Sequence, residues 1–331
     1  MRRALTSVNL SLSSACGADC VFCPSDRGTR IHTKNMQFVV AQKIIDEMSS
    51  DSYRDTYETT RMQIGENGDC FINKSAIDIL RYIKLRRPDI SVNVFTDVQF
   101  FTPEKLEIVM RESLLDFVGL NIDGNTATSF FAVKRLSWKH VEQFIPKFVE
   151  LREKYSATTR LAVQSLTMRH YVDAVRVHLG RNPSRIDDQR LLTLEDDFDS
   201  IKVRISPFLR EGDQFGRSSP MFWAERNSVD VNDLDYDKYL CPLIERVCTE
   251  AFIAPDGTWY ACCFDSNNQL VLGNVYETSL SEVERGEVRR NLIRRLSEKK
   301  FGEIGGPCAT VNCCQFGISE PLLHDESLLS Q

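Results

Sequence analysis

The chain has 331 residues, of which 42% are hydrophobic and 27% are charged, and its formal net charge is −6. This acidic balance argues against a surface that neutralises many phosphates, so we expect no nucleic-acid partner. The basic start runs into polar residues, and no later stretch is long and apolar enough to span a bilayer, which predicts a cytoplasmic protein without a signal peptide or a membrane partner.

Eleven cysteines fall into two groups. The first occupies residues 16–23 and the second residues 241–314, with Cys70 alone between them. An odd and clustered set differs from the paired pattern of a secreted disulfide scaffold. We interpret the two groups as two metal sites.

Short apolar runs alternate with amphipathic stretches from about residue 5 to residue 207. This alternation is typical of parallel strands joined by crossover helices, so we predict an α/β fold that forms a barrel or part of one. The expected strands are Leu5–Leu12, Met62–Gly65, Ser91–Thr96, Phe117–Ile122, Arg160–Thr167 and Ile201–Ser206.

Helix signals fall between these strands. The segment Phe38–Met48 carries apolar residues on one face. Thr102 followed by Pro103 provides a cap and a first-turn proline for a second helix. Ser137 is expected to cap a third helix that continues to Tyr155.

A change in composition divides the chain. Residues 210–220 are rich in Gly, Ser and charged residues and are typical of a linker. We therefore predict a barrel domain over residues 1–207 and a small cysteine-rich α+β module over residues 208–331. Within the module we expect a hairpin over Ala251–Cys263 and a charged helix over Leu280–Lys300.

The first cysteine group, Cys16, Cys20 and Cys23, follows the first expected strand. Three thiolates leave one iron of a cubane cluster open, by the logic that separates catalytic from structural zinc sites. The spacing Cys-x-x-x-Cys-x-x-Cys, with the aromatic Phe22 before the last cysteine, resembles the signature of the radical S-adenosylmethionine (SAM) superfamily. The resemblance implies a partial (β/α)6 TIM-like barrel and a [4Fe-4S] cluster whose open iron binds SAM.

A glycine-rich segment after the second expected strand, residues 65–73, resembles the Gly-Gly-Glu-Pro segment that holds the SAM amino group in this superfamily. The sequence departs from that pattern. One register places Asp69 at the acidic position and Cys70 at the proline, whereas the other makes Glu66 the acid. Both acids remain candidates.

Two further pairs follow the third and fourth expected strands. Thr96-Asp97 resembles the Thr-Asn-Gly that lies near the SAM ribose, and Asp123-Gly124 resembles the Asp-Gly of relatives, although either pair also fits a cap or a turn. The SAM-contacting residues implied by the resemblance are Phe22, Gly65, Glu66, Gly68, Asp69, Thr96, Asp97 and Asp123.

The second cysteine group resembles the C-terminal SPASM or twitch module of radical SAM enzymes. Its expected hairpin can bring Cys248 and Cys262 side by side. The Cys-x2-Cys-x5-Cys-x3-Cys run of modules with two clusters is absent, so we predict one auxiliary [4Fe-4S] cluster. The expected ligands are Cys248, Cys262, Cys308 and Cys313, with Cys263, Cys314 and Cys241 as rivals. Four thiolates also suit zinc.

The resemblance implies a reaction. An electron from reduced flavodoxin or ferredoxin enters the first cluster, SAM is cleaved to a 5′-deoxyadenosyl radical, and the radical takes a hydrogen atom from the substrate. The auxiliary cluster then accepts an electron, which gives net oxidation, or ligates the substrate. A spare thiol that returns hydrogen would epimerise the carbon, and Cys70 and Cys241 are the candidates, although a buried free cysteine is also a common packing residue.

The substrate class is less specified. The cysteine motif starts at residue 16 and leaves no room for the leader-binding extension of many peptide-modifying relatives. We therefore expect dehydrogenation, epimerisation or related C–H chemistry on a sugar, aminocyclitol or nucleotide-like molecule, with maturation of a ribosomally made peptide as the alternative. Arg204 and Arg210, which we expect near the end of the sixth predicted strand, are candidates for polar contacts with the substrate. A zinc-stapled binding module without redox chemistry is the hypothesis from another class.

Overall fold

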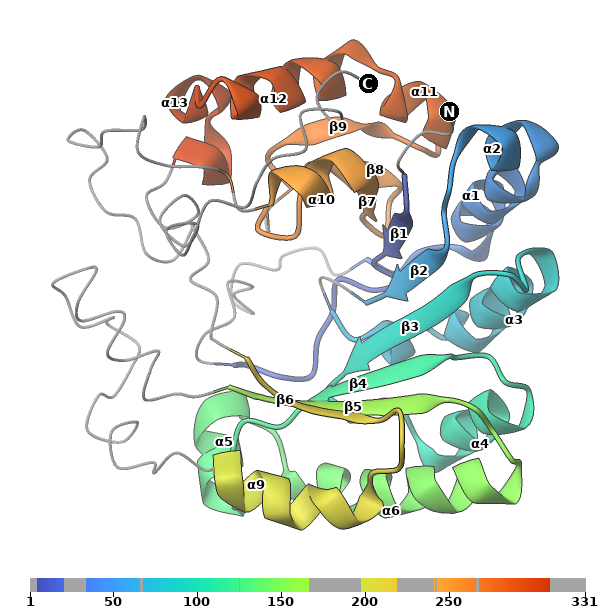
Figure 1. Ribbon diagram of the computed structural model, residues 1–331, viewed down its shortest axis with the longest axis vertical. Helices are drawn as coiled ribbons and strands as arrows, with labels where there is room; N and C mark the ends of the chain where they lie inside the picture. Colours follow the sequence, from blue (N-terminus) through green and yellow to red (C-terminus); the bar gives the residue numbers. More distant parts are fainter. Residues whose placement is uncertain are drawn as a thin grey trace, which may run out of the picture.

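A nine-stranded sheet organises the computed structural model, with its strands in the order β6-β5-β4-β3-β2-β1-β7-β8-β9 (Figure 1). The neighbours from β6 to β7 are parallel, and β8 and β9 are antiparallel to their neighbours. The structure describes residues 5–20, 34–65, 68–124, 126–166, 198–218, 241, 243–265 and 268–309.

Apolar runs form the strands at the centre of the sheet. Strand β1 is buried along its whole length, as expected for a strand with parallel partners on both sides. The strands are β1 (Ser7–Leu10), β2 (Arg61–Ile64), β3 (Ser91–Thr96), β4 (Phe117–Asn121), β5 (Arg160–Leu166), β6 (Gln214–Ser218), β7 (Glu250–Ile253), β8 (Thr258–Tyr260) and β9 (Val271–Asn274). The first five confirm the predicted strands and their α/β alternation.

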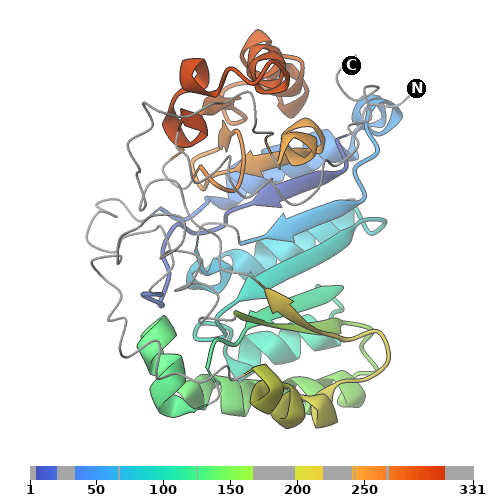
Figure 2. The ribbon, with the colours of Figure 1, turned by 60° about the vertical axis from the view of Figure 1, so that its left-hand side comes forward.

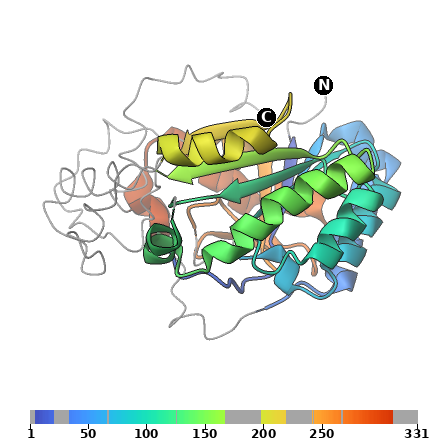
Figure 3. The ribbon, with the colours of Figure 1, turned by 90° about the horizontal axis from the view of Figure 1, so that it is seen from below.

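Crossover helices cover the outer face of the parallel strands, where α1, α3, α4 and α6 lie side by side (Figures 1 and 3). The predicted caps are confirmed, because the side chains of Thr102 and Ser137 accept hydrogen bonds from the backbone N–H groups of Lys105 and Lys139. The helices of this part are α1 (Phe38–Ser49), α2 (Asp51–Thr56), α3 (Ala76–Arg86), α4 (Pro103–Arg111), α5 (Ala127–Lys134), α6 (Trp138–Lys154) and α9 (Phe198–Ile205), with the 3₁₀ turns η1 (Cys70–Ile72) and η2 (Ser206–Phe208).

The predicted sixth strand, Ile201–Ser206, is wrong, because most of this segment belongs to helix α9. Its apolar residues alternate, but Ile201 and Ile205 are buried while Val203 is 75% exposed, and a spacing of four matches the period of a helix. The sixth parallel strand is β6, which pairs with β5 inside the segment predicted to be a linker. The domain boundary at residue 207 stays a prediction; the pairing of β6 supports a later one.

The C-terminal part confirms the predicted hairpin, since β7 and β8 are antiparallel around a turn at residues 254–257. The predicted helix over Leu280–Lys300 is wrong as one piece, because Gly286 leaves the helical conformation and caps a second helix. In Figure 2 these helices lie at the opposite end of the molecule from α6 and α9. The helices of this part are α10 (Ile244–Thr249), α11 (Leu280–Glu284), α12 (Glu287–Ser297) and α13 (Phe301–Ile304), followed by η4 (Gly306–Ala309).

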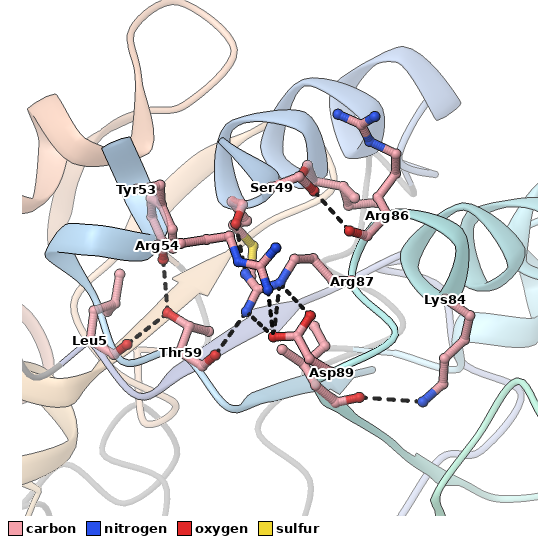
Figure 4. Close-up of polar contacts among 12 residues, drawn as sticks. Leu5, Ser49, Tyr53, Arg54, Thr59, Lys84, Arg86, Arg87 and Asp89 are labelled. Atoms are coloured by element: carbon pink, nitrogen blue, oxygen red, sulfur yellow. Dashed lines mark hydrogen bonds and ion pairs between the residues drawn. The ribbon is translucent and has the colours of Figure 1, made fainter. Parts of the chain in front are cut away.

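A buried arginine ties the amino ends of the first strands to α1 and α2 (Figure 4). Arg87 is 4% exposed and donates to the carbonyl oxygens of Met48 at 2.6 Å and Thr59 at 3.1 Å, and to the carboxylate of Asp89. The Thr59 hydroxyl in turn donates to the carbonyl of Leu5 just before β1. This network stiffens the edge of the sheet that lies away from the cysteine loop.

Candidate active site

The loop that carries the first cysteines leaves the carboxyl end of β1 and is held by its backbone. The N–H of Ser14 donates to the carbonyl of Lys34, and the carbonyl of Ala15 accepts from the N–H of Asp69 at 2.8 Å. Cys16 is half-buried and Cys20 is buried. Phe22 and Cys23, also predicted for this site, lie outside the described residues.

Two glycines let the neighbouring loop approach the cysteine loop. Gly65 has φ +90°, in the left-handed region that favours glycine. A Cβ on Gly68 would lie 2.4 Å from the carbonyl oxygen of Ala15 and 2.5 Å from that of Ser13, so a larger residue would push the cysteine loop away. Glu66, the other candidate acid of this loop, lies outside the described residues.

Asp69 is buried between the ends of β2 and β3. One carboxylate oxygen accepts from the N–H of Phe71 at 2.9 Å and the other from the hydroxyl of Thr96 at 3.1 Å. Burial raises the pKa of Asp69 to about 6, and the charge of Asp97 adds to this increase. The structure therefore brings together three residues predicted for the SAM site, Asp69, Thr96 and Asp97.

A buried lysine that the sequence analysis did not identify lies beside them. Lys134, at the end of α5, is 2% exposed, and its Nζ lies 2.9 Å from Asp97 and 3.1 Å from Asp123. The other oxygen of Asp97 accepts from the Sγ of Cys16 at 3.7 Å. Although burial opposes the charged form, the two carboxylates hold the pKa of Lys134 well above its usual value.

Lys134 joins the strand ends to the cysteine loop. Its carbonyl oxygen accepts the N–H of Asp19 at 3.0 Å, next to Cys20. A sequence signal exists, because the buried positions of α5 are 129, 130, 133 and 134, which places this lysine on the same face as Phe130 and Val133. A lysine on an apolar helix face needs buried anionic partners.

Cys70 lies behind this site on η1. It is 1% exposed, and burial raises the pKa of its thiol well above the usual value, with the charge of Asp69 adding to the effect. The thiol is therefore neutral and packed against the core. Its predicted role as a hydrogen donor stays a prediction.

The second cysteine group lies around the β7–β8 hairpin. Burial raises the pKa of Cys262 to about 12, and the charge of Cys241 contributes, so these two thiols are electrostatic neighbours. The Sγ of Cys263 accepts from Nη1 of Arg246 at 3.1 Å. Cys308 is buried on η4.

The predicted auxiliary site is incomplete within the ranges that the structure describes. Cys313 and Cys314 lie outside these ranges. In the part of the chain that is described, no three metal-binding side chains converge on one point. The donor chemistry nevertheless fits an iron–sulfur cluster at both cysteine groups, because soft thiolates select for such clusters or zinc.

The two arginines proposed as substrate contacts lie elsewhere. Arg204 pairs with Glu142 at 2.5 Å and stacks over Trp138, both on α6. Arg210 donates to the carbonyl oxygens that precede β5, at the amino edge of the sheet. The expectation that both lie near the end of the sixth strand is wrong, because that strand is a helix.

Comparisons with known proteins agree with this architecture. The family model of the SPASM iron–sulfur cluster-binding domain matches residues 241–314. A search of curated protein sequences finds no match. Across the described residues, no helix is long and apolar enough to cross a membrane.

Several solved structures share the fold. BtrN in complex with AdoMet and 2-DOIA has a TM-score of 0.51 and 12% identity, over 95% of this chain and 93% of that chain. SuiB of Streptococcus suis bound to S-adenosylmethionine has a TM-score of 0.54 and 14% identity, over 88% and 68%. For anSMEcpe with bound AdoMet the TM-score is 0.55 at 13% identity, over 88% and 83%. The chain therefore shares the fold of these SAM-bound proteins, a partial TIM-like barrel, and its residues 241–314 match the SPASM iron–sulfur cluster-binding domain.

Proposed function

We propose that this protein reductively cleaves SAM and abstracts a hydrogen atom from a small polar substrate. One observation carries the proposal: the thiol of Cys16 lies against Asp97, which Lys134 joins to Asp123 at the carboxyl ends of β3 and β4. Catalytic groups of TIM-like barrels gather at this edge of the sheet. The shared fold supports the same assignment.

Different residues of this chain are assigned to the cluster and to SAM. Cys16, Cys20 and Cys23 would hold a [4Fe-4S] cluster, which when bound supplies the electron that cleaves SAM to a 5′-deoxyadenosyl radical. Asp69 or Glu66 would receive the SAM amino group. The remaining contacts are assigned to Phe22, Gly65, Gly68, Thr96, Asp97 and Asp123.

Lys134 makes this arrangement electrostatically possible. A carboxylate beside a cysteine thiolate repels it, since two like charges in a low-dielectric site disfavour each other. The positive charge of Lys134 balances the negative charge of Asp97. The Asp97 carboxylate can then accept hydrogen bonds from a hydroxyl of the SAM ribose. Burial of these groups keeps water from the reacting atoms.

The auxiliary cluster is assigned to the SPASM module, with Cys248, Cys262, Cys308 and Cys313 as ligands. The proximity of Cys241 to Cys262 strengthens Cys241 as a rival. The hydrogen bond from Arg246 to Cys263 supports Cys262 over its neighbour as a ligand. A reduced flavodoxin or ferredoxin would supply the electrons.

The extent of the structural match supports a small substrate. The alignment with BtrN, solved with 2-DOIA, covers nearly all of both chains. A peptide substrate is the second candidate, because SuiB was solved with the precursor peptide SuiA and anSMEcpe with the Cp18Cys peptide. Dehydrogenation and epimerisation are the two outcomes that we propose.

Anaerobic reconstitution tests the proposal. We expect a brown protein that releases 5′-deoxyadenosine from SAM in the presence of dithionite. The Cys16→Ala, Cys20→Ala, Cys23→Ala variant should keep only the iron of the auxiliary cluster and lose this activity. Cys248→Ala should lose only the iron of the auxiliary cluster and retain SAM cleavage in the absence of substrate. A colourless protein that binds stoichiometric zinc would instead establish the binding module.

A further inference from the structure

A buried arginine caps the helix that carries one of the proposed auxiliary ligands. Arg289 on α12 is 5% exposed. Its Nη2 donates to the carbonyl oxygens of Val247 at 3.1 Å and Cys248 at 2.6 Å, in the last turn of α10. The guanidinium therefore satisfies the carbonyls that a helix end leaves without partners.

The position of this guanidinium is fixed from two sides. Its Nη1 lies 3.4 Å from Oε1 of Glu284, which is itself 8% exposed. The other oxygen of Glu284 accepts from the hydroxyl of Tyr57 at 3.0 Å. Tyr57 follows α2, so the barrel part of the chain helps to orient a charge within the SPASM module.

The guanidinium donates at 2.6 Å to the backbone carbonyl of Cys248 itself, so its positive charge lies beside the residue that carries the proposed ligand thiol. The same cation would stabilise the thiolate that binds iron, since only the thiolate is a metal ligand.

We propose that Arg289 is a positioning residue of the auxiliary cluster, which holds the Cys248 turn and raises the reduction potential of that cluster. The inference rests on the proposed function, which assigns Cys248 as a ligand. One-electron reduction adds a negative charge to the cluster, and a nearby buried cation favours the reduced form. The negative charge of Glu284 opposes this effect, so its removal should act with the opposite sign.

The test measures the auxiliary cluster alone. In the Cys16→Ala, Cys20→Ala, Cys23→Ala background, iron content and the midpoint potential are determined by potentiometric titration with detection by electron paramagnetic resonance. Arg289→Gln should lower the ratio of reduced to oxidised cluster about tenfold at a fixed potential, which is ~59 mV for one electron. Glu284→Gln should shift the ratio the other way.

Two controls separate charge from packing. Arg289→Lys keeps the charge and should retain most of the parental potential. Arg294→Gln removes an equal charge from an exposed position of the same helix and should leave the potential unchanged. If Arg289 acted only through packing, Arg289→Gln would lose iron, but Arg289→Gln and Glu284→Gln would not shift the midpoint potential in opposite directions.

The outcomes distinguish this inference from the proposed function. If the Cys16→Ala, Cys20→Ala, Cys23→Ala background protein binds no iron, the protein has no auxiliary cluster, and both that part of the proposed function and this inference are wrong. A full cluster at the parental potential in Arg289→Gln would overturn the inference and leave the cluster in place. Should Arg289→Gln fail to fold, Glu284→Gln decides, because an unchanged or lower potential contradicts the role given to Arg289.

Discussion

Each of the two cysteine-bearing regions holds a buried cation near its cysteines, Lys134 in the barrel and Arg289 in the SPASM module, and the two cations have different partners. Lys134 in the barrel meets two carboxylates, Asp97 and Asp123, which come from the ends of different strands. Arg289 in the SPASM module meets two carbonyls of one short helix and a single carboxylate. The lysine thus joins strand ends around the cysteine loop, whereas the arginine completes a helix.

Removal of the lysine is the strongest test of this difference. Lys134→Met should lower the free energy of unfolding by about 3–5 kcal/mol, because it leaves the buried carboxylate of Asp123 and the half-buried carboxylate of Asp97 without their cation. Denaturant titration of the apo protein measures the loss. Adding Asp97→Asn and Asp123→Asn should recover part of it, and a triple variant no more stable than Lys134→Met would contradict the electrostatic explanation.

The barrel site should also make the stability of the protein depend on pH. Because the pKa of Asp69 rises from 3.8 to about 6 on folding, its contribution to stability is present below pH 3.8 and is lost as the pH rises through 6. The stability of Asp69→Asn relative to the parent should therefore increase by about 2 kcal/mol between pH 4 and pH 7.5. Unfolding curves of both apo proteins across this range provide the measurement, and parallel curves would rule out the proposed shift.

The arginine of the module should matter less to stability than the lysine. Arg289→Gln is expected to cost about 1–3 kcal/mol, since it leaves the carbonyls of Val247 and Cys248 without their donor. The same denaturant titration applies, with Arg294→Gln as the exposed control. A loss as large as that of Lys134→Met would erase the distinction between the two regions.

The smallest loss of stability is expected for a substitution where the two regions meet. Tyr57→Phe removes one hydrogen bond to Glu284 and should cost about 1 kcal/mol. The midpoint potential of the auxiliary cluster should stay at the parental value, because no charge near Cys248 changes. A shifted potential would mean that the tyrosine, and not the arginine charge alone, sets the local field.

The sequence predicted the central strands well because their buried positions leave an apolar signal, which alternates along β3 and is continuous at the centre of β4. Strand β6 was missed because Gln214–Ser218 is polar and lies at the end of the sheet, where it has one neighbour. The segment Ile201–Ser206 was assigned to a strand because its alternating apolar residues match both periods over such a short length. Only the packing of this segment against the core distinguishes the helix from a strand.

The candidate site was predicted residue by residue but not as a network. The motif positions Asp69, Thr96 and Asp97 were each named from a resemblance, and the structure adds the contacts among them. Lys134 was missed because its role depends on two carboxylates that lie 37 and 11 positions away in the chain. The spacing of the buried positions in α5 places Lys134 on an apolar helix face, but it does not identify these two carboxylates as its partners.

The pairing of β1 with β7 has a consequence for any attempt to divide the protein. Every residue of β1 is buried, and its two neighbours come from opposite ends of the chain. Deleting residues 241–314 would turn this buried strand into an open edge, with a row of unpaired backbone groups facing solvent. Such edges recruit other chains, so the shortened protein should aggregate rather than persist as a free-standing barrel.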